Sequence, residues 1–446
     1  MFRNRLFLKG LALVGLCLAL LIPLSMINGL VIERGYHKQQ AIQSVVESTA
    51  GEQRLTGMVL VVDYFTRHHE KVWDKASESH ELIPRERWHQ VFFLPESLVA
   101  NALVTPDFRS RGIYEVPIYD SDWKIDGHFD QAEITRFAKE KKNFLKWGKA
   151  RLVMGVSDAR GISEPFLELD GRALELKPGT GSTALGQGVH ANIQSFDPAG
   201  LGAFSLGINL RGTQRLAFSP IANDTRVLMK SSWPHPKFDG KFLPFEREVT
   251  AEGFSADWRV SAFSTSATQS QDTCSRLDCA TFMQPDFGVQ LIEPVDLYYK
   301  IRRSVEYGIL FILMTFVAFF LVETMLKKQL HAVNYILVGF SLAIFYLLLL
   351  SLSEHLGFAL AYLLATIDCA SLIAYYLSGV LDSRRGGMAF GAAIGALYAM
   401  LFVILHSEDF ALLMGSTLLF AGLAQVMVMT RKVNWRAVGR PEQADE

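Results

Sequence analysis

Long apolar stretches alternate with a polar central part along this 446-residue chain. A helix of about 20 predominantly apolar residues spans the hydrocarbon core of a bilayer. One such stretch lies near the N-terminus and the others follow residue 304: 10–32, 305–325, 333–352, 357–378, 386–405 and 410–430. The pattern therefore predicts a membrane α-helical protein with six transmembrane helices, the last five of which form a compact bundle.

The first apolar stretch has two interpretations, a cleaved signal peptide or a permanent membrane anchor. The apolar part of a signal peptide is usually about 7–15 residues long and is followed by a cleavage site of the Ala-x-Ala type. Residues 10–32 form a longer run, and no such site precedes Glu33 and Arg34. We therefore expect an uncleaved anchor, and apolar residues at helical spacing predict that residues 33–47 extend it as a stalk.

The charges that flank the apolar stretches predict the orientation in the membrane, because Lys and Arg concentrate on the cytoplasmic side. The segments that flank the apolar stretches are of two kinds, which alternate along the chain. One kind is basic and contains Arg3, Arg5, Lys327, Lys328, Arg384, Arg385, Arg431, Lys432 and Arg436. The other kind contains Glu354, His355, Glu408 and Asp409 and has no Lys or Arg. This alternation predicts that both termini are cytoplasmic and that residues 33–303 lie outside the cytoplasm.

In the central part, the apolar period changes from helical to two. Phe204, Leu206, Ile208 and Leu210 alternate with small or polar residues, as in a half-buried strand. Clusters of Gly, Pro, Asp and Asn separate many short segments of this kind. The central part is therefore predicted to be all-β-rich, an antiparallel sandwich or related barrel with one or two helices, one of them over about residues 130–149.

Four regions follow from these patterns. They are a cytoplasmic N-terminus with the first transmembrane helix (1–32), a periplasmic β-rich domain with its stalk (33–303), a five-helix bundle (304–430) and a cytoplasmic tail (431–446). Composition adds one exclusion. The formal net charge is -1 and Lys and Arg form no long cluster, so we expect a lipid bilayer and no nucleic acid as a partner.

The four cysteines divide between the membrane and the central part. Cys17 and Cys369 lie in apolar stretches and are explained as small apolar side chains. Cys274 and Cys279 lie in a polar segment rich in Ser and Thr, where they are expected to form a disulfide in an oxidising compartment. The alternative, a pair of metal ligands, is disfavoured because no histidine lies nearby. A disulfide would place the domain in a bacterial periplasm or its equivalent.

The central part contains none of the common catalytic or nucleotide-binding motifs. Residues 155–159 lack only the closing glycine of a nucleophile elbow, but a lone serine at a strand end is usually structural. His68 and His69 are adjacent and would point to opposite faces of a strand, so one metal ion cannot easily bind both. We therefore expect no catalytic, cofactor-binding or metal-binding residues and no enzyme activity.

Ionisable residues inside the membrane carry more weight, because each costs about 2.5–3.5 kcal/mol at the centre of a helix. Asp368 lies near the middle of its stretch, and two interpretations stay open: a proton or cation relay, or a hydrogen-bonded residue facing the bundle. Glu323 precedes Lys327 by four residues, which favours an interfacial ion pair. Glu354 and His355 mark the outer end of the third helix, in position to contact the periplasmic domain.

Small residues form a row in the fifth stretch. Gly387, Gly391 and Gly395 are spaced four apart, and Ala399 continues the row. Such rows let two helices approach closely in a membrane. The row predicts a close helix contact, either within the bundle or between the protomers of a homo-oligomer.

Several segments together resemble the CreD family of inner-membrane proteins over essentially the whole chain. They are residues 337–358 with Ser353-Glu354-His355, then 93–98, 111–114, 157–162, and 233–236 with 242–244. The resemblance implies a Gram-negative inner membrane, a large periplasmic domain, expression under the Cre sensor-regulator system, and a role in envelope integrity and the β-lactam response. It implies no reaction and no catalytic residues, and the Cys274/Cys279 segment is not part of it.

Three functions are compatible with these observations. The favoured one is a non-enzymatic inner-membrane protein whose periplasmic domain binds an envelope protein or glycan. The first alternative is an ion-coupled transporter or transducer that uses Asp368. The second alternative is a cell-wall glycan-binding or hydrolytic module, in which Trp123, Trp233 and Trp258 would stack on sugars by analogy with other β-sandwiches.

Overall fold

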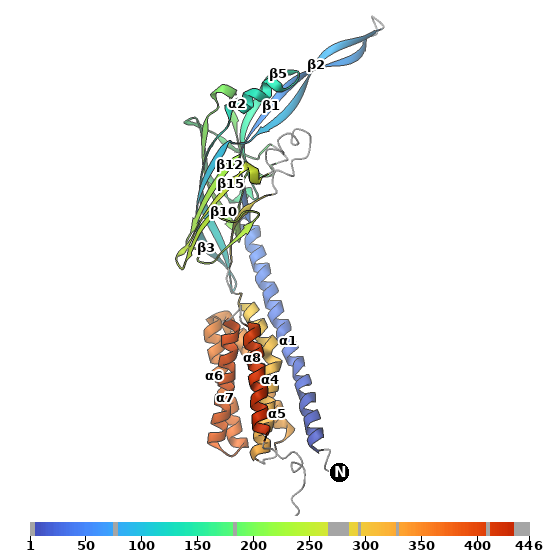
Figure 1. Cartoon of the computed structure of the whole chain (residues 1–446), viewed down its shortest axis with the longest axis vertical. Coiled ribbons are helices and arrows are strands. Elements are labelled where there is room, and N and C mark those ends of the chain that lie inside the picture. The colour runs from blue at the N-terminus through green and yellow to red at the C-terminus, as the bar shows by residue number, and fades with distance from the viewer. Residues whose placement is uncertain are drawn as a thin grey trace, which may run out of the picture. The chain divides into compact units, whose positions relative to one another are not determined.

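The computed structural model describes residues 5–74, 79–181, 185–265, 285–292, 296–326, 330–406 and 411–431. They belong to two compact units, a helical unit of residues 1–39 and 295–446 and a β unit of residues 40–294. Helix α1 (Arg5–Ser48) contributes to both, since its 44 residues form one continuous helix. The helix continues past residue 32, as the predicted stalk requires (Figure 1).

The helical unit contains the first part of α1 and five further described helices. These are α4 (Leu297–Leu326), α5 (Ala332–Leu356), α6 (Phe358–Val380), α7 (Arg384–His406) and α8 (Ala411–Thr430). Helix α5 packs on α4 and α6, and α7 packs on α6 and α4. Within the described residues, α1 and α4 to α7 are long and apolar enough to cross a membrane, while the apolar run of α8 is shorter, Leu413–Ala424. The structure thus supports the membrane-helical class with five full-length candidates.

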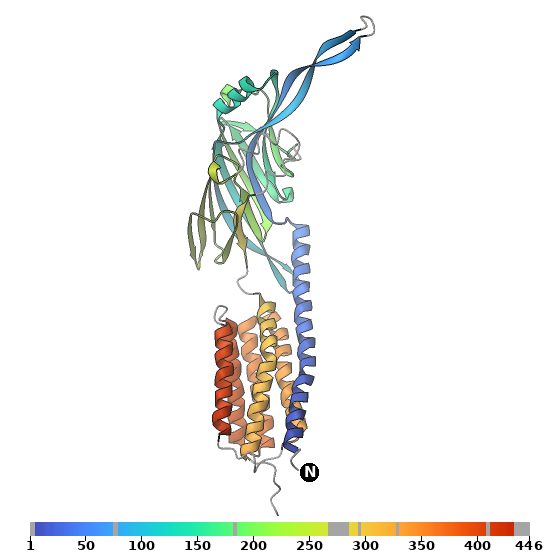
Figure 2. The same ribbon diagram turned by 45° about the vertical axis from the view of Figure 1, so that its right-hand side comes forward.

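The β unit consists of two eight-stranded sheets (Figure 2). Sheet A contains β1 (Gln53–Asp74), β2 (Ser79–Phe93), β5 (Phe144–Val156), β8 (Leu176–Pro178), β9 (Gly188–Ile193), β11 (Arg215–Ser219), β13 (Pro236–Gly240) and β16 (Phe287–Leu291). Its order is β13-β16-β11-β1-β5-β9-β8, and β2 pairs with β1.

Sheet B has the order β14-β15-β12-β3-β4-β10-β6-β7. Its strands are β3 (Ser97–Arg111), β4 (Tyr114–His128), β6 (Ile162–Leu169), β7 (Arg172–Leu174), β10 (Ala203–Thr213), β12 (Asp224–Ser231), β14 (Glu246–Thr250) and β15 (Gly253–Ser261). The alternating apolar residues of both sheets meet in one core, where Trp258 of β15 stacks on Phe287 of β16 with ring centroids 5.2 Å apart. This is the packing expected of a sandwich.

The sheets are mixed, which corrects the prediction of an antiparallel sandwich. Strand β1 pairs in parallel with β11, with Gln53 opposite Leu216, and β3 pairs in parallel with β12, with Ser97 opposite Asp224. The remaining strand pairs are antiparallel. An apolar period of two reveals a strand but not the direction of its neighbour, so the sequence pattern did not indicate these parallel pairs.

The beginning and the end of the β unit lie close together in sheet A. Gln53 of β1 is opposite Leu216 of β11, and Leu216 is in turn opposite Val289 of β16. Neighbouring strands are about 4.8 Å apart, so two such steps separate Gln53 from Val289 by roughly 10 Å. The chain therefore enters and leaves this sheet at the same end of the same three strands.

The helix of the β unit is shorter than predicted. We expected a helix over residues 130–149, whereas α2 spans Gln131–Glu140 and β5 begins at Phe144. Asp130 caps the start, because its side chain accepts a hydrogen bond from the N–H of Ala132. Lys141 has extended dihedral angles and Asn143 has a positive φ of 62°, so the chain turns here and continues as a strand. Pairing with β1 outweighs the helical spacing of the following residues.

Candidate binding surface

A two-stranded ribbon, formed by residues 67–74 of β1 and 79–86 of β2, extends beyond the rest of sheet A, with the pair Phe65–Trp88 at its base (Figure 1). Strand β1 pairs with β5 only as far as Thr66, opposite Phe144, and the N–H of Arg67 donates the last hydrogen bond on this side to Asn143 (2.9 Å). The β1–β2 ladder continues as far as Asp74 opposite Ser79. Isolated two-stranded hairpins are marginally stable in water, so this length of ribbon calls for support.

An aromatic cluster supports the base of the ribbon. The ring of buried Tyr64 stacks on His89 with centroids 5.0 Å apart, and it makes an edge contact with Phe137 of α2 at 5.3 Å. Phe137 in turn stacks on Trp147 of β5. Burial, followed by the nearby charge of Arg87, lowers the pKa of His89 below its ordinary value. His89 is therefore neutral at pH 7. The contacts of Tyr64 with Phe137 and of Phe137 with Trp147 fix the base of the ribbon between β5 and α2.

One face of the ribbon carries exposed aromatic and aliphatic side chains. Residues that are directly opposite in an antiparallel ladder point to the same face. The register places five pairs of residues on one face. From the base to the tip they are Phe65–Trp88, Arg67–Glu86, His69–Pro84, Lys71–Leu82 and Trp73–His80. Trp73, Leu82 and Trp88 are more than half exposed. We call this set of residues the aromatic face.

The aromatic face is also basic. Arg67 and Lys71 lie on it, and Lys146 of β5 is placed 5.2 Å from the ring centroid of Phe65. The acidic residue of this face, Glu86, is paired with Lys146 at 3.2 Å. The face therefore presents more positive than negative charge beside its large apolar side chains. On the opposite face, Glu70 and Arg85 form an exposed ion pair at 3.4 Å.

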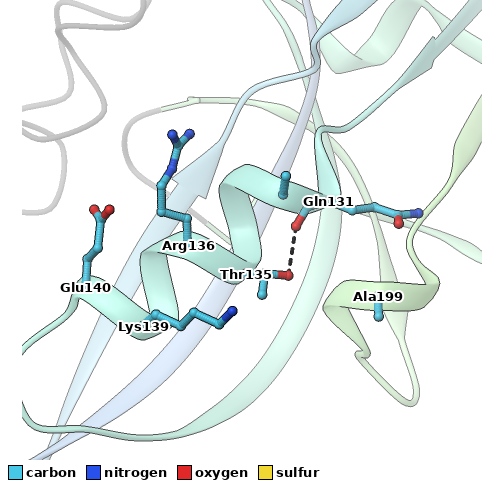
Figure 3. A pocket seen from close by; sticks show the side chains of 7 residues that line it. Gln131, Thr135, Arg136, Lys139, Glu140 and Ala199 are labelled. Atoms are coloured by element: carbon cyan, nitrogen blue, oxygen red, sulfur yellow. Dashed lines mark hydrogen bonds between the residues drawn. The ribbon is translucent and has the colours of Figure 1, made fainter.

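A hollow of about 540 Å³ lies beside α2, between that helix and Ala199 (Figure 3). The hydroxyl of Thr135 donates to the carbonyl oxygen of Gln131 (2.9 Å), which belongs to the helix itself. Lys139 points away from Arg136 and Glu140, so these charged side chains do not converge on one point. This hollow brings no nucleophile, base or set of ligands together, and the ribbon is the stronger candidate for binding.

The segment that resembles a nucleophile elbow instead fixes the end of α1. Asp158 accepts hydrogen bonds from the N–H of Gly51 and from the guanidinium of Arg160, and Arg160 donates to the carbonyl oxygen of Glu47 (2.7 Å). That carbonyl lies in the last turn of α1, where no helical N–H is available. The hydrogen bonds from Arg160 lower the pKa of Asp158 to about 2. Ser157 donates to the carbonyl oxygen of Glu52 (2.7 Å), a structural role.

The three tryptophans considered for sugar stacking lie in the core. Trp123, Trp233 and Trp258 are 3%, 7% and 0% exposed. This removes the residues on which the glycan-binding alternative depended. The exposed tryptophans of the described β unit are Trp73 and Trp88, which the sequence reasoning did not single out. Trp73 is opposite His80 and Trp88 is opposite Phe65, and this pairing is known only from the register of the hairpin.

Asp368 lies on the outer surface of the helical unit. It is exposed near the middle of α6, next to Ile367 and Leu372, which are 53% and 58% exposed. One of our two interpretations placed Asp368 against the other helices of the bundle, and the structure corrects this. A relay within the bundle also loses support, because the side chain points away from its interior.

Glu354 joins three helices at one end of the helical unit. Its carboxylate accepts a hydrogen bond from the hydroxyl of Tyr298 in α4 (3.1 Å), and Arg34 of α1 lies 3.6 Å away. A second ion pair, Lys38–Asp296 at 3.6 Å, connects α1 to the residue before α4. These contacts hold α1 against the bundle. His355, the neighbour of Glu354, is exposed.

Glu323 is buried near the opposite end of α4. The hydroxyl of Tyr335 donates to one carboxylate oxygen (2.8 Å), and the N–H of Leu330 donates to the other (3.2 Å). The first bond joins α4 to α5, and the second joins α4 to the chain that leads into α5. The predicted partner Lys327 lies outside the described residues, as do Cys274 and Cys279 and therefore their predicted disulfide.

Two of the three glycines of the predicted row in α7 lie against α6. A Cβ atom on Gly387 would lie 2.5 Å from the nitrogen of Ser378, and one on Gly391 would lie 2.5 Å from the Cβ of Ala374. A Cβ atom on Gly395 would meet nothing within 4 Å. The first two glycines thus permit the close contact between α6 and α7 within one chain.

Comparison with known proteins agrees with this architecture. The family model of the inner membrane protein CreD matches residues 5–436. Inner membrane protein CreD of Escherichia coli (strain K12) is 35% identical over 444 residues, which cover 99% of this chain and 96% of that protein. The match includes both units. The chain therefore belongs to the CreD family of inner membrane proteins.

Proposed function

We propose that this chain supports the integrity of the cell envelope from the inner membrane, in the response to envelope and β-lactam stress, by binding an envelope partner through its β unit. The observation that carries the proposal is the aromatic face of the ribbon, along which Trp73, Leu82 and Trp88 are exposed together with basic residues. Exposed groups of large apolar side chains on a soluble surface usually mark a site of interaction. The proposal assigns no reaction to the chain.

The proposed topology has six transmembrane helices, with α8 as the sixth, both termini in the cytoplasm and the β unit in the periplasm. It is supported by the alternation of basic and acidic links along the sequence. With this topology, the ribbon meets components of the periplasm or cell wall and not cytoplasmic proteins.

The chemistry of the aromatic face favours an anionic partner. Trp side chains supply large contact areas. The three positive charges of Arg67, Lys71 and Lys146 outnumber the single negative charge of Glu86. An extended envelope protein or glycan that carries negative charge along its length would match both features. Attraction of this kind weakens as salt is added, because exposed charges are screened over about 8 Å at physiological ionic strength.

Photocrosslinking in living cells tests the proposal. Probes at Lys71 and Leu82 on the aromatic face are expected to give a discrete adduct with one envelope component, and mass analysis of the adduct identifies it as protein or glycan. Probes at Glu70 and Arg85 on the opposite face should give much less of it. Positions around Phe93 and Trp233, although they lie in segments shared with the family, are poor probe sites because both side chains are buried.

Substitution supplies the matching functional test. The double substitution Trp73→Ala and Trp88→Ala should abolish the adduct and the protection of the envelope, while Phe263→Ala should change neither. Phe263 is a suitable control because it is fully exposed in the β unit and lies outside the ribbon. Full envelope protection by a chain in which a short turn replaces residues 67–86 would refute the proposal.

A further inference from the structure

The outer face of α6 combines a carboxylate with apolar side chains at the middle of a membrane-spanning helix. The exposed residues of this face are Leu364, Ile367, Asp368, Ser371, Leu372 and Tyr375. Helix α6 is 23 residues long, and Asp368 lies close to its centre. In an inner membrane protein, this position faces the hydrocarbon core of the bilayer.

The side-chain carboxyl of Asp368 has no hydrogen-bond or ion-pair partner in the part of the chain that the structure describes. The hydroxyl of Ser371 donates to the backbone carbonyl oxygen of Asp368 (3.1 Å) and leaves the carboxyl uncompensated. Acidic residues inside membranes almost always face a protein interior or a water-filled cavity, or pair with another group. A single copy of the helical unit therefore leaves one requirement of Asp368 unmet.

A second copy of this chain would not supply a cation. The six apolar stretches contain no Lys and no Arg, and the basic residues lie beyond their ends, as at Arg34, Arg302 and Arg384. Contact between two α6 faces would instead bring two carboxyls of the same charge sign together, and two like charges repel each other. The absence of a basic residue from these stretches therefore favours a different protein as the source of a complementary charge.

We propose that the outer face of α6 docks a transmembrane helix of another membrane protein, one that carries a Lys or Arg near the middle of its span. The ion pair between that residue and Asp368 provides specificity, and the aliphatic side chains on either side provide packing. Ser371 and Tyr375 add hydroxyl groups along the same face for hydrogen bonds with the partner helix. This contact is separate from the ribbon and from its envelope partner.

Photocrosslinking from α6 in the full-length chain tests the inference. Probes at Leu364 and Leu372, one turn on either side of Asp368, are expected to give one discrete adduct in cell membranes. The crosslinked segment of the partner should be a spanning helix with a Lys or Arg near its centre. Asp368→Asn should lower the yield of the adduct at least tenfold, while Asp368→Glu should retain it.

Charge reversal separates the ion pair from a general effect on folding. Asp368→Lys should abolish the adduct, and replacement of the partner's basic residue by Glu should restore it. Probes at Phe340 and Ile344, which are exposed on α5, serve as controls and should crosslink only lipid. An adduct of two copies of this chain, an adduct with a helix that has no central basic residue, an equal yield from the Asn variant, or lipid adducts alone from α6 would each overturn the inference.

Discussion

Asp158 shows how one carboxylate connects a helix to a sheet. It accepts hydrogen bonds from Gly51 and Arg160, and Arg160 in turn reaches the carbonyl oxygen of Glu47 at the end of α1. The amide of Gln53, which is 1% exposed, donates to the carbonyl oxygens of Asp158 and Arg211. Together these groups supply hydrogen bonds to backbone atoms of Glu47, Gly51, Asp158 and Arg211, near the start of β1.

The pKa of Asp158 predicts a dependence of stability on pH. Its folded-state pKa of about 2 lies below the ordinary value of 3.8, so the ionised group stabilises the folded protein fully above about pH 4. This contribution is lost as the pH falls through about 2. We expect Asp158→Asn to lower the melting temperature of the full chain in detergent at pH 7, and the difference from the wild type to shrink between pH 4 and pH 2.

Glu175→Gln is the control for this experiment, because Glu175 is 83% exposed and lies 3.7 Å from Lys177. It should leave the melting temperature nearly unchanged at every pH. A difference between the wild type and Asp158→Asn that stayed constant from pH 7 to pH 2 would argue against the assigned pKa.

A second residue-scale prediction concerns Glu354. Its side chain is 9% exposed and is held by Tyr298 and Arg34, so Glu354→Gln should destabilise the helical unit by about 1.5 kcal/mol, the value of a hydrogen bond to a charged group. Glu306→Gln should cost less than about 0.5 kcal/mol, since Glu306 is 53% exposed and pairs with Arg302 one turn away. Thermal unfolding in detergent measures both, and equal losses would contradict the role of Glu354.

At the scale of elements, α6 and α7 form a close pair because α7 has no side chains at Gly387 and Gly391. We expect Gly391→Ala to destabilise this contact by about 1–3 kcal/mol, since its new Cβ would lie 2.5 Å from the Cβ of Ala374. Gly395→Ala should be neutral or slightly stabilising, because it meets no atom within 4 Å and Ala favours a helix over Gly. Melting temperatures of the two variants decide the matter, and a larger loss at Gly395 would contradict the packing.

The sequence predicted the type of most elements better than the direction in which their side chains face. The strands around Leu206 and the continuation of α1 past residue 32 are where the patterns placed them. The orientation of Asp368 could not be read, because α6 is apolar on nearly every side and shows little contrast between its faces. The ribbon was missed because residues 66–71 are all polar, so the apolar period of two that reveals a strand ends before the ribbon begins.

At the scale of the whole molecule, the proposed topology can be checked by chemical labelling. In a chain without its four native cysteines, Phe263→Cys should react with a membrane-impermeant maleimide in intact spheroplasts, because this position is fully exposed in the β unit. Asp445→Cys should react only after the cells are lysed, because the C-terminus is expected in the cytoplasm. The reverse pattern would invert the topology, and labelling of both positions before lysis would require an odd number of spans.

Gln53, Leu216 and Val289 lie opposite one another on three neighbouring strands of sheet A. This arrangement bears on how such a protein could have arisen and how it can be divided into modules. Since its ends lie roughly 10 Å apart in one sheet, the β unit has the geometry of a domain inserted into a surface loop of another protein. A few residues of extended chain span the roughly 10 Å between these two positions of the sheet. We therefore expect that residues 50–292 can be exchanged as one module between members of the family.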